Sequence, residues 1–140
     1  MTATVIAAAF AALYAGHQVG DHVTGQTHAQ ALGKAQSKNW LRPMLGHLAG
    51  YHLTLAAFLG ALAVAGVRMS WIGVGVALLF SAATHGFIDR RWPVRWYLER
   101  TGSAEFAQLT SNGMNGMYLA DQALHVGCLF ISALIIGGMS

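Results

Sequence analysis

Charged residues are scarce in this chain. Lys, Arg, Asp and Glu together make up 9% of its 140 residues, against about 25% in an ordinary soluble domain. Hydrophobic residues make up 55%, and the mean hydropathy is +0.48. This composition excludes a conventional soluble domain and predicts an integral-membrane protein whose immediate partner is the lipid bilayer.

Cysteine is nearly absent, and so is charge near the beginning of the chain. Cys128 is the single cysteine and lies in an apolar run, which excludes an intramolecular disulfide framework. No Lys or Arg precedes His17, so the first apolar stretch is predicted to be a span and not a cleaved signal peptide. The net charge is +3, but the basic residues lie between apolar runs, which favours membrane topology over nucleic-acid binding.

Four apolar stretches each have close to the roughly 20 residues that cross a bilayer. The predicted fold class is therefore all-α: a single integral-membrane domain, residues 1–140, in which four transmembrane helices form a bundle with up-down topology. The loop between the third and fourth spans interleaves arginines with Trp92, Trp96 and Tyr97 and is predicted to hold a short interfacial helix. The predicted spans are residues 2–21, 44–67, 69–89 and 118–139.

The polar ends of the four spans are predicted to meet at one membrane face, because odd spans carry their polar residues at the carboxyl end and even spans at the amino end. Seven of the eight Lys and Arg lie in the two loops at that face, and only Arg68 lies in the other turn. The positive-inside rule then places the site toward the cytoplasm and both termini outside. We expect a multi-pass protein of the cytoplasmic membrane, and four short spans are compatible with a homo-oligomer.

Every aspartate in the sequence has a histidine four residues away. On a helix this spacing puts both side chains on one face, so that each pair can supply two ligands to one bound ion. Ionisable residues within membrane spans are expensive and suggest a functional site. His47 lies at the same depth as the three pairs, whereas His52 is on another face. The predicted metal ligands are His17, Asp21, His47, His85, Asp89, Asp121 and His125.

Imidazole and carboxylate ligands without thiolates suit a divalent transition metal such as Zn, Mn or Fe. Seven ligands exceed the four of one tetrahedral site, so two metals that share a carboxylate are one interpretation. Supporting roles in catalysis are predicted for Gln122 and Tyr51 as hydrogen-bonding groups, and for Arg90 and Arg91 as anion clamps. The alternatives are pairs that hydrogen-bond between helices without metal, and arginines that serve only membrane topology.

Four ordered sequence blocks carry a resemblance to a known family. The blocks are His17-Gln-Val-Gly-Asp21-His22, His47-Leu-Ala-Gly-Tyr51, Thr84-His85-Gly-Phe-Ile-Asp89-Arg90-Arg91 with Pro93, and Tyr118-Leu-Ala-Asp121-Gln122-Ala-Leu-His125. They resemble a small bacterial and phage integral-membrane family of unknown function, especially its actinobacterial branch. The resemblance implies a four-helix membrane protein with the same seven His and Asp residues as hallmarks. Gln26 departs from the family pattern, since it follows Asp21 by five residues instead of four.

The pattern is also loosely similar to membrane-bound metal-dependent hydrolases, which implies a reaction class. The leading hypothesis is a metal-dependent hydrolase that acts at the cytoplasmic face on a phosphate- or ester-bearing lipid or a small anionic metabolite. A second hypothesis is a transporter or ion-conducting protein that uses the His/Asp cluster, although the outer halves of the spans are almost wholly apolar. A third is a non-enzymatic phage exclusion or regulatory protein with a structural metal.

Overall fold

The computed structural model describes residues 2–24, 26–36 and 38–140, and the fold is all-α as predicted. Four helices are long and apolar enough to cross a membrane: α1, α3, α4 and α7. Shorter elements connect them at one end. In chain order the elements are α1 (Thr2–His22), α2 (His28–Gln36), α3 (Leu41–Val64), α4 (Trp71–Asp89), α5 (Trp92–Arg100), α6 (Ala104–Gln108), β1 (Thr110–Ser111), β2 (Met114–Asn115) and α7 (Gly116–Gly138).

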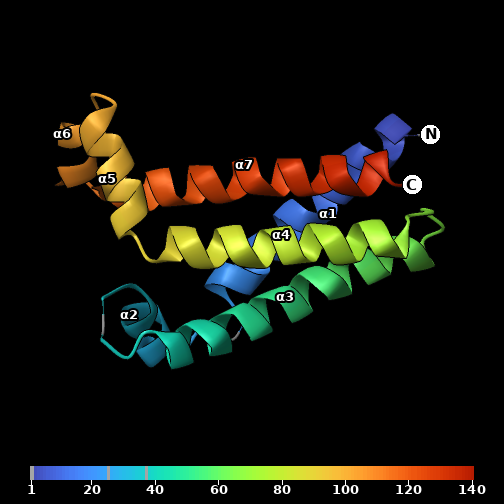
Figure 1. Ribbon diagram of the computed structural model, residues 1–140, viewed down its shortest axis with the longest axis horizontal. Coiled ribbons are helices and arrows are strands. Elements are labelled where there is room, and N and C mark those ends of the chain that lie inside the picture. The colour runs from blue at the N-terminus through green and yellow to red at the C-terminus, as the bar shows by residue number, and fades with distance from the viewer. Residues whose placement is uncertain (1, 25, 37) are drawn as a thin grey trace.

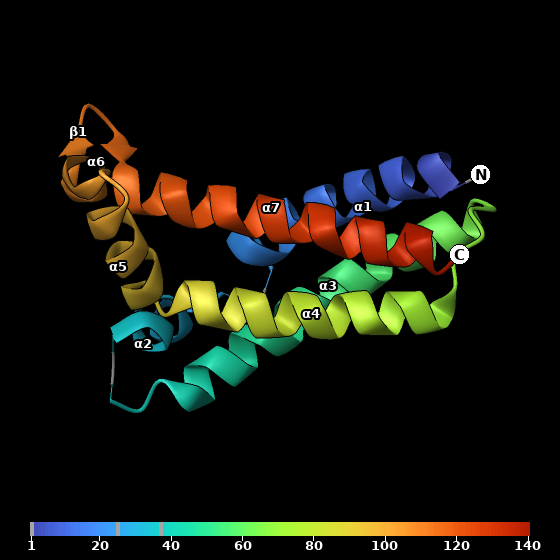
Figure 2. The same ribbon diagram turned by 45° about the horizontal axis from the view of Figure 1, so that its top comes forward.

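The four long helices lie side by side, and each packs against two others (Figures 1 and 2). Helix α1 contacts α3 and α7, while α4 contacts the same two helices from the other side. Both termini and the α3–α4 turn lie at one end of the bundle, and α2, α5 and α6 lie at the other (Figure 1). The elements that contain most of the basic residues are therefore gathered at a single end.

The bundle is apolar at the end that holds the termini. Its core there joins Leu13 of α1, Leu55 and Leu59 of α3, and Leu129 and Ile136 of α7, all buried. The buried histidines and aspartates lie toward the opposite end of the helices, next to α2 and α5. Burial of apolar side chains thus closes one half of the bundle, while the other half combines the polar cluster with a second apolar cluster around Ile88 and Met117.

Helix boundaries differ from the predicted spans by a few residues, for local reasons. Helix α3 ends at Val64 and not at residue 67, because Gly66 takes φ +92° and the N–H groups of Gly66 and Val67 bond back to Ala63 and Leu62. This is the double hydrogen-bond pattern of a glycine-terminated helix. Helix α4 begins at Trp71 because the Ser70 hydroxyl caps it by accepting from the Gly73 N–H at 3.3 Å.

The first polar segment contains a short helix of its own, α2. A reciprocal capping box starts α2: the Gln30 N–H donates to Thr27 Oγ1 at 3.2 Å, and the Thr27 N–H donates to Gln30 Oε1 at 2.8 Å. The third loop is also more structured than the one short helix predicted, since it contains α5, α6 and a two-stranded hairpin. Gly102, at φ +82°, separates α5 from α6.

Candidate metal centre

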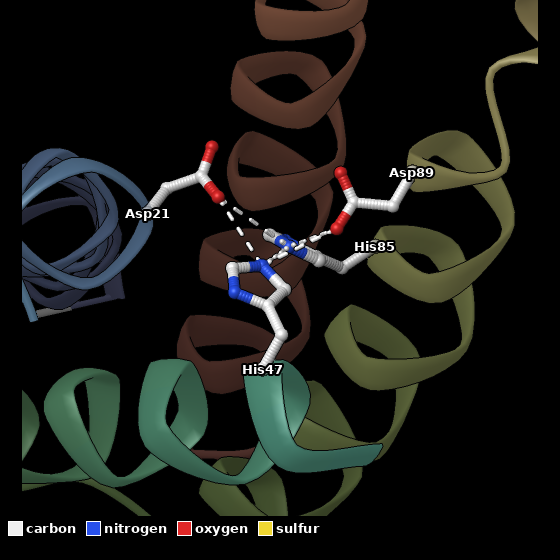
Figure 3. Close-up of side chains that lie close together, drawn as sticks. All are labelled: Asp21, His47, His85 and Asp89. Carbon is white, nitrogen blue, oxygen red and sulfur yellow. Dashed lines mark hydrogen bonds and ion pairs between the residues drawn. The ribbon is translucent and has the colours of Figure 1, made fainter. Parts of the chain in front are cut away.

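Four buried side chains from three helices converge at the polar end of the bundle. Asp21 comes from α1, His47 from α3, and His85 and Asp89 from successive turns of α4 (Figure 3). Each offers one ligand atom, and these four atoms all lie within 4.8 Å of one another. None of the four residues is more than 4% exposed. This group could hold a metal ion, and its chemistry of two imidazoles and two carboxylates suits a transition metal.

The spacing of the four ligand atoms is close to that of a tetrahedral site. The Nε2 atom of His47 lies 2.9 Å from His85 Nε2, 3.2 Å from Asp21 Oδ1 and 3.2 Å from Asp89 Oδ2. His85 Nε2 lies 3.1 Å from Asp89 Oδ2 and 3.9 Å from Asp21 Oδ1. A tetrahedral ion with bonds of 2.0–2.1 Å separates its ligand atoms by about 3.3–3.4 Å. These five distances bracket that value, and the sixth, between the two carboxylates, is within 4.8 Å.

Small residues on α1 bring Asp21 within reach of α3. A Cβ atom added at Gly20 would lie 3.2 Å from Tyr51 Cδ2, and one added at Gly16 would lie 3.1 Å from Leu55 Cδ2. A side chain at either position would require the facing residue of α3 to shift by a few tenths of an ångström. The close approach of α1 and α3 is therefore what places the carboxylate of Asp21 beside the imidazole of His47.

A lysine that the sequence analysis did not include lies against the same four residues. The Nζ atom of Lys34, on α2, is 2.8 Å from Asp89 Oδ2, 3.0 Å from His47 Nε2 and 3.8 Å from Asp21 Oδ1. An ion at the centre of the ligands would be about 2 Å from each of them. Nζ thus caps the face of the tetrahedron formed by these three residues, and its positive charge is the counter-ion of the two carboxylates.

His17 stands beside the four-residue group and supports it through hydrogen bonds. Gln122 donates its Nε2 hydrogens to Asp21 Oδ2 at 3.0 Å and to Asp121 Oδ2 at 3.3 Å, so its Oε1 accepts from His17 Nε2 at 3.0 Å. His17 Nδ1 then accepts from the Tyr51 hydroxyl at 3.1 Å. Both nitrogens of His17 are engaged, and the chain of bonds from Tyr51 to Asp21 fixes the orientation of that carboxylate.

Asp121 and His125, on α7, lie next to the group without joining it. The Nδ1–H of His125 donates to the Asp121 carbonyl oxygen at 2.9 Å, so its Nε2 is the ring nitrogen that faces the centre. That Nε2 atom faces Asp89 Oδ1 at 3.9 Å and has no hydrogen-bond partner in the described part of the chain. The ring of His125 also packs on His85, with centroids 4.2 Å apart. His125 is thus positioned to exchange a proton near Asp89.

The imidazoles of the centre are held by packing instead of hydrogen bonds at Nδ1. Metal-bound histidines usually donate their second ring N–H to an acceptor. Within residues 2–24, 26–36 and 38–140, Nδ1 of His47 and of His85 has no such partner. The ring of Tyr51 lies 4.0 Å from the ring of His85 and 6.1 Å from that of His47, measured between centroids. Aromatic contacts therefore fix the two rings.

Among the described residues, neither of the two predicted anion clamps is hydrogen-bonded to or ion-paired with the four ligand residues. Arg90 donates from Nη1 to the Lys34 carbonyl oxygen at 2.9 Å and stacks on the Trp40 ring at 4.4 Å. This pair of contacts fastens α2 and the start of α3 to the end of α4. Arg91 is exposed and lines a cavity beside α5. The contacts of Arg90 thus support the centre by holding Lys34 in place.

Of the seven predicted ligands, the structure gathers four around one point and places the other three beside them. Comparison with protein families, curated proteins and solved structures gives no match for the chain. The resemblance to the membrane family of unknown function stays a prediction, and the assignment of the site depends on its geometry alone.

Lys34 was missed because nothing in its local sequence sets it apart from a solvated lysine in a polar loop. The capping box of Thr27 and Gln30 could have predicted the start of α2, but a local motif does not predict how the helix packs against the rest of the chain. The burial of Lys34 comes from the contacts of α2 with α3, which are tertiary.

Proposed function

We propose that this chain is a multi-pass membrane protein that binds a divalent transition metal through Asp21, His47, His85 and Asp89 and uses it in hydrolysis. The single observation that supports the metal is the convergence of four buried ligand atoms from three helices within 4.8 Å of one another. Zn, Mn and Fe all accept this mixture of imidazole and carboxylate. Four ligands are enough for one tetrahedral ion, so we propose one metal per chain; the dinuclear site stays a prediction.

The four apolar helices are proposed to cross the cytoplasmic membrane in up-down order. Their lengths of 19 to 24 residues suit the bilayer. The end that carries α2 and α5 also carries seven of the eight Lys and Arg, which favours its placement in the cytoplasm with both termini outside. The metal centre then lies at the inner leaflet, within reach of cytoplasmic water.

Four protein ligands fill a tetrahedral ion, so a catalytic metal here would need a fifth coordination position for water or substrate. The face of His47, Asp21 and Asp89 that Lys34 caps is the place for such a position, since Nζ lies outside the ligand tetrahedron there. When bound, the metal supplies Lewis acidity and a water that ionises near neutral pH. Movement of Lys34 from this face would admit a water or a substrate oxygen and give the ammonium an anionic substrate to pair with.

The remaining polar residues have roles in this proposal that follow from their contacts. Gln122 and Tyr51 hold His17 and, through Gln122, the carboxylate of Asp21. The Nε2 lone pair of His125, 3.9 Å from Asp89 Oδ1, can accept a proton next to the centre. The substrate proposed is a phosphate- or ester-bearing lipid or small metabolite, because the site lies at the end of the bundle that carries the arginines.

Transport is less well supported than hydrolysis. A translocation route needs polar groups through the depth of the membrane. In the described half of the bundle nearest the termini, Leu13, Leu55, Leu129 and Ile136 pack together, and the buried Ser132 hydroxyl donates to the Ala77 carbonyl oxygen at 3.4 Å. This half therefore offers few polar groups for a translocation route.

The second alternative is a metal-free structural role, in which ion pairs of the cluster hold the helices together. One observation favours it: the ammonium of Lys34 lies between the two carboxylates of Asp21 and Asp89.

Metal content separates these functions. We expect purified wild-type protein in neutral detergent to contain about one equivalent of transition metal by elemental analysis, and His85→Ala and Asp89→Asn to lose it. His28→Ala is the matched control, because His28 is an exposed histidine outside the cluster. Circular dichroism of each variant verifies that helices remain. Wild-type protein that stays free of metal after exposure to Zn, Mn and Fe would contradict the metal site and support the metal-free structural role of the ion pairs.

Hydrolase activity is a separate test. Metal-loaded wild type should cleave a phosphate or ester substrate that Asp89→Asn leaves intact. A protein that binds metal but fails on a broad panel of phosphate and ester substrates would instead support the structural-metal role.

A further inference from the structure

Three arginines line a polar cavity at the end of the bundle that carries α5. Arg90, Arg91 and Arg95 share this cavity of about 640 Å³ with the polar side chains of Gln108 and Thr110. No acidic residue lines it. Among the residues that the structure describes, none of the three guanidinium groups forms an ion pair with a carboxylate. The lining of the cavity therefore carries a net positive charge and fits an anion.

An apolar groove of about 790 Å³ adjoins this cavity. It lies between α4, α5 and α7 and is lined by aromatic and aliphatic side chains that include Phe87, Trp96, Tyr97 and Leu124. Trp92 lines both the groove and the arginine cavity, so the two spaces meet at its ring. Phe87 and Trp92 are 58% and 59% exposed, so the groove is open to an apolar ligand.

We propose that the arginine cavity and the groove together form a binding site for one anionic phospholipid. The phosphate would pair with Arg91 and Arg95, and an acyl chain would lie in the groove along α4 and α7. The two volumes fall within the range of about 300–1,000 Å³ of small-molecule sites. Helix α5 crosses the end of the bundle (Figure 2), where Trp and Tyr side chains mark the level of lipid headgroups. Charge at this level and an apolar space below it match an anionic amphiphile.

The backbone of Arg91 supports a binding role for its side chain. Arg91 has φ +59° and ψ −33°, a conformation that residues other than glycine rarely adopt. Such conformations concentrate at ligand sites, where the surrounding structure holds them. Here the strained residue begins α5 and presents its guanidinium to the cavity. Glycine at this position would relieve the backbone and remove the charge, which makes Arg91→Gly a favourable probe.

The phospholipid site is next to the metal centre. Ala35, which follows Lys34 on α2, lines the arginine cavity, and Arg90 follows Asp89 on α4. A bound phosphate would therefore lie beside the face that Lys34 caps. That this phospholipid is also the substrate rests on the proposed function, whereas its binding does not depend on a metal.

Native mass spectrometry in neutral detergent tests the proposal with phosphatidylglycerol and phosphatidylcholine of identical acyl chains. We expect one phosphatidylglycerol per chain and much weaker binding of phosphatidylcholine. The double variant Arg91→Gly/Arg95→Gln should bind phosphatidylglycerol about thirtyfold more weakly. The matched control Lys38→Gln/Arg68→Gln removes two exposed charges outside the cavity and should bind as wild type. Equal binding of both lipids, or loss in the control as well, would overturn the proposal.

Two further measurements fix the occupant and separate this site from the metal centre. Phosphatidylglycerol with brominated acyl chains should quench the fluorescence of Trp92 in a variant whose other tryptophans are Phe. Displacement of the lipid by millimolar inorganic phosphate alone would show an anion site without a role for the groove, and would refute the lipid. Asp89→Asn should lose metal and keep the lipid, while the double arginine variant should keep its metal.

Discussion

Replacement of Lys34 by methionine should change both the stability of the metal-free protein and its affinity for metal. Lys34 is 6% exposed, and its Nζ lies 2.8 Å from Asp89 Oδ2 and 3.8 Å from Asp21 Oδ1. Lys34→Met keeps the apolar stem and removes the charge, so two buried carboxylates lose their counter-ion. Removal of one partner of a buried ion pair costs about 3–5 kcal/mol. Metal-free Lys34→Met should be less stable than the wild type by about 3 kcal/mol at the lower end of that range.

The same free energy should appear again as metal affinity. In the wild type a metal must displace the Lys34 ammonium, and the ion pairs of Lys34 with the two carboxylates are lost. In Lys34→Met the carboxylates are already without a partner, so metal binding does not carry this cost. We therefore expect the variant to bind Zn²⁺ about a hundredfold more tightly, which corresponds to about 3 kcal/mol. Isothermal titration calorimetry in detergent measures the affinity, and thermal unfolding with and without chelator measures the stability.

The matched control is Lys38→Met, since Lys38 is exposed and contacts none of the four ligand residues. It should change neither the affinity nor the stability. Lys34→Met with an unchanged or weakened affinity for Zn²⁺ would refute the reasoning that the ammonium and the metal compete for one face of the site.

Three further predictions concern the surroundings of the centre. Gln122→Leu breaks the bond to Asp21 and should weaken metal binding about 10- to 100-fold; an unchanged titration would show that this bond does not orient the carboxylate. Gly20→Ala puts a methyl group 3.2 Å from the Tyr51 ring and should lower the thermal midpoint in detergent, whereas Gly60→Ala, with open space around it, should not; equal midpoints would contradict the close α1–α3 contact. Chelation of the metal from saturated wild type should lower the midpoint on the order of 10 °C, and no shift would mean that the fold does not use the metal.

The sequence predicted the four apolar helices because length and hydropathy are local properties that packing does not alter. It also predicted that Asp21, His47, His85 and Asp89 would come together. Two of these share a face of α4 by their spacing of four residues, and the up-down order predicted for the spans places the others at the same level. Boundaries were less predictable, since the end of α3 depends on the backbone of Gly66.

The sequence does not show which of the seven predicted metal ligands form the four-residue group and which lie beside it. His17 and Asp21 have the same spacing as His85 and Asp89, yet only the first histidine turns both its nitrogens to Tyr51 and Gln122. That difference comes from which residue of another helix lies opposite, and no local pattern specifies it. The same is true of Lys34, whose charge reaches the centre only because α2 folds back onto α3.

Anomalous diffraction from crystals of the metal-loaded protein tests the central claim most directly. The account predicts one strong peak per chain, about 2 Å from Asp21 Oδ1, His47 Nε2, His85 Nε2 and Asp89 Oδ2, with Lys34 Nζ moved away from its present position. No peak among these four atoms, with Lys34 still paired to Asp89, would contradict it.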